Sequence, residues 1–256
     1  MEMKILECDW IAPYGHFSHP EMGAEGIMTF RLPPRTAILG LIAAILGLPK
    51  NTGVAALDHL ALSVRVRETL PKTFWHSETQ LQFNLHGTPQ DHFRFPHAFQ
   101  HSEPQIKLLQ REWLLQPRYT LWIGNRDFPE FSALVTRVRK QRFVFPPTMG
   151  QAMMMSHLSM TRCFDAPPCP ADGQQTYSVS TLWNLRYGTM ESKDLNQSDF
   201  TVDYFPRSVD AQRRFHIEAY GYRHAATGTL AVQPFAVPLD RSPILKTPEG
   251  EFVAWL

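Results

Sequence analysis

Residues 30–47 read FRLPPRTAILGLIAAILG, a basic turn that leads into a segment without a single charge. The two prolines fix the backbone φ angle, Thr36 can cap the start of a helix, and Gly47 suits the left-handed residue that often ends one. Because residues 37–46 are apolar on every side, exposing them to water would cost about 25 cal/mol per Å² of apolar surface. The sequence therefore predicts a buried helix around which the other elements pack.

Two arginines, Arg31 and Arg35, flank the start of this helix. Free backbone N–H groups and the helix dipole favour an anion such as phosphate at this place. Both side chains can equally be solvated arginines beside a capped core helix. The local sequence leaves these two interpretations open.

The composition limits the class of protein. With 256 residues, 43% of them apolar, the chain can bury a core in one large domain or two small ones. The 25 basic and 24 acidic residues give a formal net charge of +1, so the global basic field of a free-standing nucleic-acid-binding protein is absent. Any nucleic-acid site must therefore be local.

Cysteine usage and the apolar runs indicate the cellular setting. The three cysteines form no CxxC pattern, which favours a reducing compartment, and we expect the protein in the cytoplasm. Cys163 and Cys169 with His157 match no common zinc spacing, so neither a metal nor another cofactor is expected. The apolar helix is about half as long as the roughly 20 residues that span a bilayer, and no export signal is visible. We expect no membrane contact.

Alternating strands flank the buried helix. Residues 3–11 alternate as a half-buried strand does, and residues 54–60 predict a short helix. In residues 61–67 the apolar positions alternate with a basic face that carries Arg65 and Arg67. These two arginines are explained by solvation, or by contact with a phosphate backbone on an exposed sheet.

Residues 71–104 have a different character, with five histidines and six aromatic residues but no helical or strand periodicity. A loop of this length is usually functional, and its aromatic content argues against simple disorder. We interpret it as an inserted arm that packs against a partner or stacks on splayed bases. Only His97 and His101 have a metal-like spacing, so a zinc site is not expected.

The next segment completes a familiar element order. Pro117 divides two strands, 105–116 and 118–123, and an apolar stripe from Phe131 to Val138 predicts an amphipathic helix. The order strand, helix, strand, strand, helix fits a split βαβ unit of the RRM type. Further on, prolines indicate a connector at about 163–173, and five runs are interpreted as strands: 178–183, 200–205, 215–220, 229–237 and 251–255.

Three segments carry a resemblance to a known family. The turn and helix at 30–47, the pair REWL (111–114) and PRYT (117–120), and RFVFPPTMG (142–150) occur in the order and spacing of the CRISPR-associated "Cas-five" family of the RAMP superfamily. The resemblance implies an α+β fold with an RRM/ferredoxin-like core in residues 1–155. It also implies a thumb insertion at about 71–104 and a β-rich C-terminal extension in residues 156–256.

The resemblance further implies a function. It suggests a non-catalytic, type I-B-like subunit of a Cascade surveillance complex that caps the 5′ handle of the guide RNA (crRNA). The implied neighbours are the backbone subunit and the large subunit, with target DNA met indirectly through the complex. The implied RNA contacts are Arg31, Arg35, Thr36, Gly40, Arg65, Arg67, Phe93, Arg94, Phe95, Lys107, Arg111, Arg118 and Gly150.

Two other functions remain open. One branch of the family cleaves precursor RNA with a tyrosine at the first helix and a lysine-histidine pair beyond the thumb. Here residues 37–47 contain no tyrosine, and Leu108 follows Lys107. Metal-free cleavage needs a base and an acid within mutual reach, so we expect no catalytic residues. The alternatives are a metal-independent endoribonuclease that uses one of the histidines, and a structural subunit with protein contacts alone.

Overall fold

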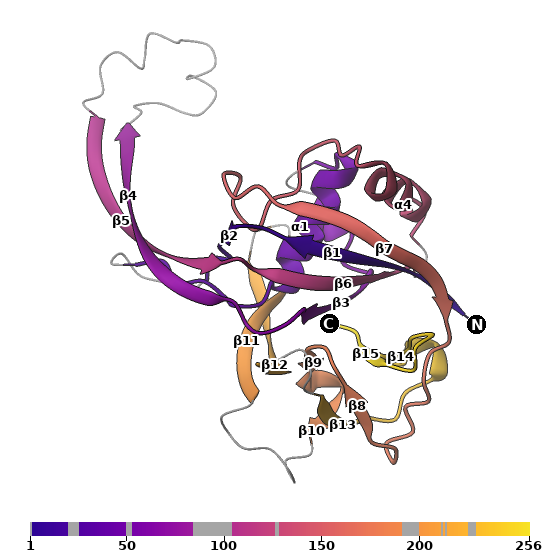
Figure 1. Cartoon of the computed structure of the whole chain (residues 1–256). Helices are drawn as coiled ribbons and strands as arrows, with labels where there is room; N and C mark the ends of the chain where they lie inside the picture. The colour runs from indigo at the N-terminus through magenta and orange to yellow at the C-terminus, as the bar shows by residue number, and fades with distance from the viewer. Residues whose placement is uncertain are drawn as a thin grey trace.

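The computed structural model describes residues 2–19, 26–49, 53–83, 104–125, 128–190, 200–210, 212, 214–224 and 229–256. It shows a mixed α/β protein that consists mostly of sheets, from which one long hairpin projects (Figure 1). Within these residues, no helix is both long enough and apolar enough to cross a membrane.

The first sheet contains β1 (Met3–Ile11), β3 (Ala61–Val66), β6 (Arg118–Gly124) and β7 (His157–Ala166). Its strand order is β3-β6-β1-β7, and all neighbours are antiparallel. Helix α1 (Arg35–Leu46) connects β1 to β3, and α4 (Phe131–Lys140) connects β6 to β7. The predicted strands and the amphipathic helix of this region are confirmed.

Strand β7 corrects the sequence interpretation. The connector expected at 163–173 begins inside this strand, where Cys163 pairs with Leu6. The first sheet consequently includes β7, which ends at Ala166. Half of the residues of β7 are half-buried, in no regular alternation, which hides the pattern that identifies a strand from sequence.

Helix α1 is buried as predicted, with Ile38, Leu39, Ile42 and Ile45 at 0% exposure. It begins at Arg35 with Pro34 in the N-cap position and no side-chain cap, so the assignment of Thr36 as N-cap is wrong. The helix ends as expected, because Gly47 adopts a φ of 78° and its N–H reaches the carbonyls of Ala43 and Ala44.

The C-terminal part forms two further sheets. The first has the order β10-β13-β8-β15-β14 and the second β11-β12-β9. Their strands are β8 (Tyr177–Val179), β9 (Trp183–Asn184), β10 (Gly188–Met190), β11 (Phe200–Val209), β12 (Phe215–Arg223), β13 (Leu230–Pro234), β14 (Ile244–Lys246) and β15 (Phe252–Ala254), with short 3-10 turns at Leu185–Tyr187 and Leu239–Arg241.

These sheets share cores with the N-terminal part. Ile5 and Trp122, on the face of the first sheet that points away from α1, pack with Leu245, Val253 and Trp255. On the other side, Phe205 of β11 and Tyr220 of β12 join the main core beside α1. The C-terminal strands therefore pack against the face of the first sheet that points away from α1.

The projecting hairpin consists of β4 (Lys72–Phe83) and β5 (Pro104–Leu115), and β2 (Tyr14–Gly15) adds a short third strand at its base (Figure 1). The insertion expected at 71–104 is thus a regular strand up to Phe83, whereas residues 84–103 lie outside the described residues. Sequence periodicity missed β4 because both of its faces meet solvent, as the 53% exposure of Trp75 illustrates. Strand β5 is confirmed.

Candidate nucleic-acid interface

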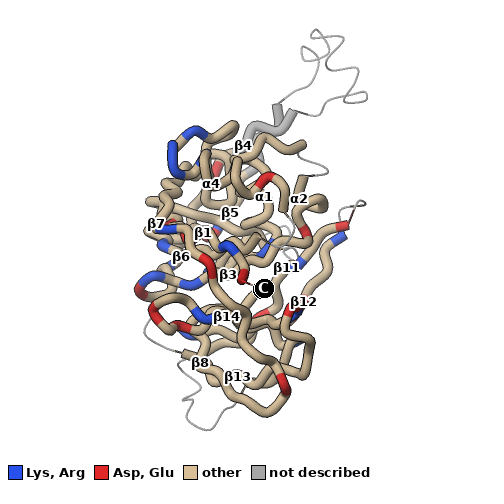
Figure 2. Tube along the Cα trace, turned by 90° about the vertical axis from the view of Figure 1, so that its right-hand side faces the viewer, with Lys and Arg blue, Asp and Glu red and all other residues tan. Residues whose placement is uncertain are grey.

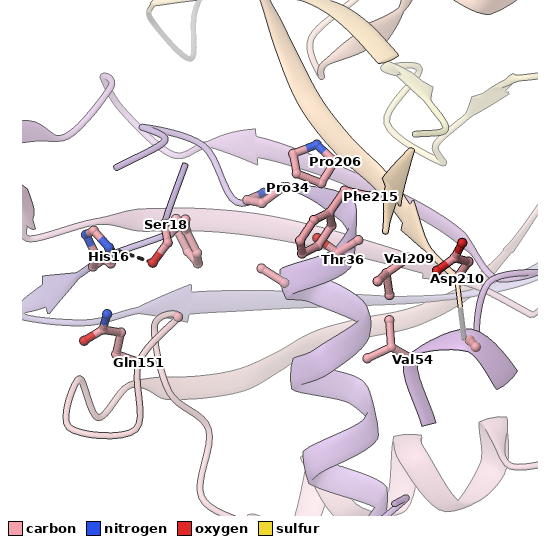
Figure 3. Close-up of a pocket in the computed structure, with 14 residues that line it drawn as sticks. His16, Ser18, Pro34, Thr36, Val54, Gln151, Pro206, Val209, Asp210 and Phe215 are labelled. Atoms are coloured by element: carbon pink, nitrogen blue, oxygen red, sulfur yellow. Dashed lines mark hydrogen bonds between the residues drawn. The ribbon is translucent and has the colours of Figure 1, made fainter. Parts of the chain in front are cut away.

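A cavity of about 540 Å³ lies at the start of α1. Four segments that are distant in sequence surround it: residues 16–18, the first turn of α1, residues 150–151, and the end of the β11–β12 hairpin, with the short helix α2 (Gly53–Ala56) below (Figure 3). Thr36 and Gly150, two of the sequence-predicted contacts, therefore come together in one site.

Gly150 holds two of these segments against each other. Its φ of 92° is in the left-handed region, and a Cβ atom there would overlap the carbonyl oxygen of His16. The His16 N–H donates to the carbonyl of Met149 at 3.0 Å. From the sequence, we expected Gly150 to let RNA approach the backbone closely. In the structure, the backbone of His16 lies against Gly150.

His16 forms the polar end of the cavity and is 1% exposed. Its Nδ1 lies 2.7 Å from the carbonyl oxygen of Glu112 and its Nε2 lies 2.9 Å from the hydroxyl of Ser18 (Figure 3). Because a carbonyl only accepts, Nδ1 carries the proton and Nε2 accepts from Ser18. Burial lowers the pKa of His16, against the opposing effect of the Glu112 carbonyl. The ring is a neutral structural element with both nitrogens engaged.

Arg35 does not face this cavity. Its side chain is 2% exposed and forms an ion pair with Asp58. It also donates to the backbone carbonyls of Asp58, of Leu60 at 2.9 Å and of Arg207 at 3.3 Å. Burial lowers the pKa of Arg35, and the neighbouring Asp58 carboxylate opposes that shift. The guanidinium thus ties α1 to the segment that follows α2 and to β11, and its donors are engaged within the chain.

Arg31 is exposed, yet its guanidinium is also engaged. It donates to the carbonyl oxygen of Pro71 from two nitrogens, at 3.0 and 2.9 Å, and so fixes the basic turn to the base of β4. The Tyr119 hydroxyl donates to the Arg31 carbonyl at 2.7 Å. Gly40 lies half-buried on α1, with open space where a Cβ atom would point. Neither residue lines the cavity.

The arginines of the first sheet divide into two groups. Arg65 forms an ion pair with Glu251, and its guanidinium lies 5.1 Å from the Trp122 ring centroid, so the C-terminal strands enclose it. Arg67 and Arg118 remain about half-exposed, paired with Asp9 at 2.9 Å and with Glu68 at 3.2 Å. The phosphate interpretation fits the second group alone.

The predicted arm contacts are described only in part. Arg111 is 7% exposed, with its Nε 3.2 Å from a Glu78 carboxylate oxygen, which makes it a structural residue of the hairpin. Lys107 belongs to β5, but its side chain lies outside what the structure describes, as do Phe93, Arg94 and Phe95 entirely.

An aromatic cluster at the base of the arm escaped the sequence analysis. The Trp113 ring lies 5.5 Å from Tyr14, 6.0 Å from Phe74 and 4.4 Å from His76, measured between ring centroids. Phe74 and Trp113 are directly paired across β4 and β5, so they share one face of the hairpin. Phe74 and His76 are two residues apart, so they lie on the same face of a strand. This spacing indicates the cluster once residues 72–83 are known to form a strand.

A basic cluster was missed as well. The last turn of α4 carries Arg137, Arg139 and Lys140, where cations complement the negative end of the helix dipole (Figure 2). In the view of Figure 2 the other Lys and Arg residues are interspersed with Asp and Glu. Among the described residues, no group of three or more His, Cys, Asp or Glu side chains could hold a metal ion.

Comparisons with known proteins identify the family. The family described as CRISPR-associated protein (Cas_Cas5) matches residues 5–215. A chain of a "CRISPR RNA-guided surveillance complex" is 15% identical, with 92% of this chain and 94% of that chain covered and a TM-score of 0.53. A CRISPR protein from Archaeoglobus fulgidus is 10% identical, with 100% and 99% covered and a TM-score of 0.52. At such identities the two structures show a common fold alone.

No curated protein matches this sequence. The family match, however, spans most of the chain. This protein is therefore a member of the CRISPR-associated protein (Cas_Cas5) family.

Proposed function

We propose that this protein is an RNA-binding subunit of a type I CRISPR surveillance complex and that it caps the 5′ handle of the crRNA. The observation that carries the proposal is the family match over residues 5–215. The order β1-α1-β3-β6-α4-β7 with the sheet order β3-β6-β1-β7 supports a ferredoxin-like core of the RRM type.

The projecting β4–β5 hairpin is the candidate thumb. Single-stranded RNA is commonly held by aromatic rings on which its bases stack. The cluster of Tyr14, Phe74, His76 and Trp113 offers such rings at the base of the hairpin, where Tyr14 is 42% exposed. This arrangement supports RNA binding between the arm and the body.

Protein partners are supported by an apolar face on the β11–β12 hairpin. Val202, Tyr204 and Ile217 are 43%, 64% and 40% exposed. Contiguous exposed apolar side chains of this kind are typical of a surface that another protein covers. In the proposed complex the partners are the backbone subunit and the large subunit, and target DNA is met through the complex.

We further propose that the protein is not a nuclease. Its α1 contains no tyrosine, and Lys107 is followed by Leu108 rather than histidine. His16 has both ring nitrogens engaged, so it is not free to take a proton from a ribose 2′-hydroxyl. The alternative of a metal-independent endoribonuclease has no candidate base among these residues.

Two experiments test the proposal. The protein is purified with its neighbouring subunits, the bound RNA is crosslinked by ultraviolet light, and the attached fragments are sequenced. A discrete fragment from the 5′ end of the crRNA on residues 14–18 or on the hairpin is expected. A complex that assembles without RNA, or RNA crosslinks without a preferred position, would contradict handle capping.

The second experiment incubates the protein with repeat RNA in EDTA. Intact RNA is expected. Cleavage that leaves a 2′,3′-cyclic phosphate, and that persists through several purification steps, would establish the nuclease instead.

A further inference from the structure

We propose that the cavity at the start of α1 receives an unstacked nucleobase of RNA and not a phosphate group. This inference rests on the proposed RNA-binding function, and it assigns the chemical class of the group that enters this particular site.

The size of the cavity suits a base. Its volume of about 540 Å³ is in the range of 300 to 1,000 Å³ that is typical of small-molecule sites. A flat heterocycle with part of its ribose fits such a space, whereas the contacts of a phosphate group require closely converging donors.

The charge of the cavity argues against a phosphate. None of the described residues that line it is lysine or arginine, since the guanidinium of Arg35 points to Asp58. Burial keeps His16 neutral by lowering its pKa. The carboxylate of Asp210 contributes to the lining, and hydrogen bonds from the Arg214 backbone, and its side chain, lower the pKa of Asp210. At the rim the Asp210 carboxylate is ion-paired with Arg214, so its charge is already balanced and the described lining offers no unpaired cation to a phosphate.

The remaining lining offers what a base needs. The Phe215 ring is 48% exposed at the cavity, and Phe17 and Pro34 provide further apolar surface. The Thr36 hydroxyl and the Gln151 amide line the same space, and Figure 3 draws no hydrogen bond from either side chain to the other residues shown. Their donors and acceptors match the polar edge of a base, while an aromatic ring stacks on its face.

An apolar side chain of a protein partner is a poorer occupant. It would fill the apolar part of the cavity but would leave the polar groups of Thr36 and Gln151 without partners in a dry interface. A polar group that is buried without a hydrogen-bond partner is destabilising, because its contacts with water are lost and not replaced. A base satisfies these groups and the apolar surface together.

The test uses the assembled complex with guide RNAs that carry one 2-aminopurine, or one abasic site, at successive positions of the 5′ segment. One position is expected to show strong quenching of 2-aminopurine fluorescence, and the abasic site there weakens binding about 10-fold. Phe215→Ala should cause a similar loss and cancel the effect of that abasic site. Phe215→Trp should retain both binding and quenching.

The matched control is Phe235→Ala, which removes an equally exposed ring, 53% exposed, that does not line the cavity. With Phe235→Ala, the abasic site should weaken RNA binding as much as it does in the wild-type complex. Phe215→Ala should also leave the salt dependence of binding unchanged, because no phosphate contact is lost.

Each other outcome has a definite meaning. A wild-type complex that binds no RNA would refute the proposed function itself. RNA that binds without any position coupled to Phe215, or a Phe215→Ala variant with a shallower salt dependence, would refute the base pocket alone. The cavity would be assigned to a side chain of a protein partner by two results together. Phe215→Ala would fail to join the complex, and no RNA position of the wild-type complex would show quenching or an effect of the abasic site.

Discussion

Gly150 packs so closely against His16 that the carbonyl oxygen of His16 occupies the space of a Cβ atom at position 150. The contact joins the segment after β2 to the loop after α4, and both segments line the cavity at the start of α1. Only glycine combines this contact with a φ of 92°.

Gly150→Ala should therefore destabilise the protein by at least about 2 kcal/mol, from backbone strain together with the clash. Gly40→Ala is the matched control. An added Cβ there meets no atom within 4 Å, and alanine is favoured over glycine inside a helix, so a gain of about 0.5 to 1 kcal/mol is expected. Urea unfolding measures the free energy of unfolding of both variants. Equal free energies for Gly150→Ala and Gly40→Ala would contradict the prediction.

Arg35→Ala should reduce stability by about 3 kcal/mol, because it leaves the Asp58 carboxylate and three backbone carbonyls without their donor. Arg35→Lys should recover little of the loss, since one ammonium cannot reach all of these acceptors. Thermal unfolding measures the effect. An Arg35→Ala variant that unfolds like the wild type but binds RNA with a shallower salt dependence would restore the phosphate interpretation.

The sequence predicts elements well where one face of a strand, or all faces of a helix, are buried. Helix α1 and strands β1, β3 and β6 follow this rule, because the core imposes their apolar pattern. Strand β4 breaks it, since its neighbouring residues Trp75 and His76, which point to opposite faces, are both exposed. The start of α1 was misplaced because a proline in extended conformation occupies the cap position.

The candidate site was harder to predict. The sequence shows that an arginine is present but not which group it contacts. Arg65, for example, forms an ion pair with Glu251, which is far away in the sequence. The cavity depends on Phe215 and Asp210, which no motif connects to residues 30–47. Such long-range contacts leave no local periodicity, so they are visible only in the folded chain.

The buried His16 should make stability fall with acidification. Because its folded-state pKa is lowered, the unfolded chain takes up a proton first as the pH falls below about 6.5, the ordinary value for histidine. Stability is thus fully present above that pH and declines below it, by at most about 1.4 kcal/mol per pH unit from this group. His16→Asn keeps a donor for Glu112 without titrating, so its stability should change less between pH 7 and about pH 5.5. His157→Asn, at an exposed position, should retain the wild-type dependence.

Substitutions of Arg118 and Arg65 should distinguish an arginine that contacts RNA from one that stabilises the fold. The Arg118 side chain is 52% exposed and its ion-pair partner Glu68 is 72% exposed, so a phosphate can replace that partner. Arg118→Ala should weaken binding of the assembled complex to crRNA and reduce the slope of log affinity against log salt by about 0.7, the value for one phosphate contact of a single strand. Arg65 is enclosed between Glu251 and Trp122, so Arg65→Ala should lower the unfolding temperature and leave the salt slope unchanged. If the salt slopes of Arg118→Ala and the wild type were equal, Arg118 would not belong to the RNA interface. A variant that has lost a phosphate contact releases fewer counterions on binding, so its slope must be smaller.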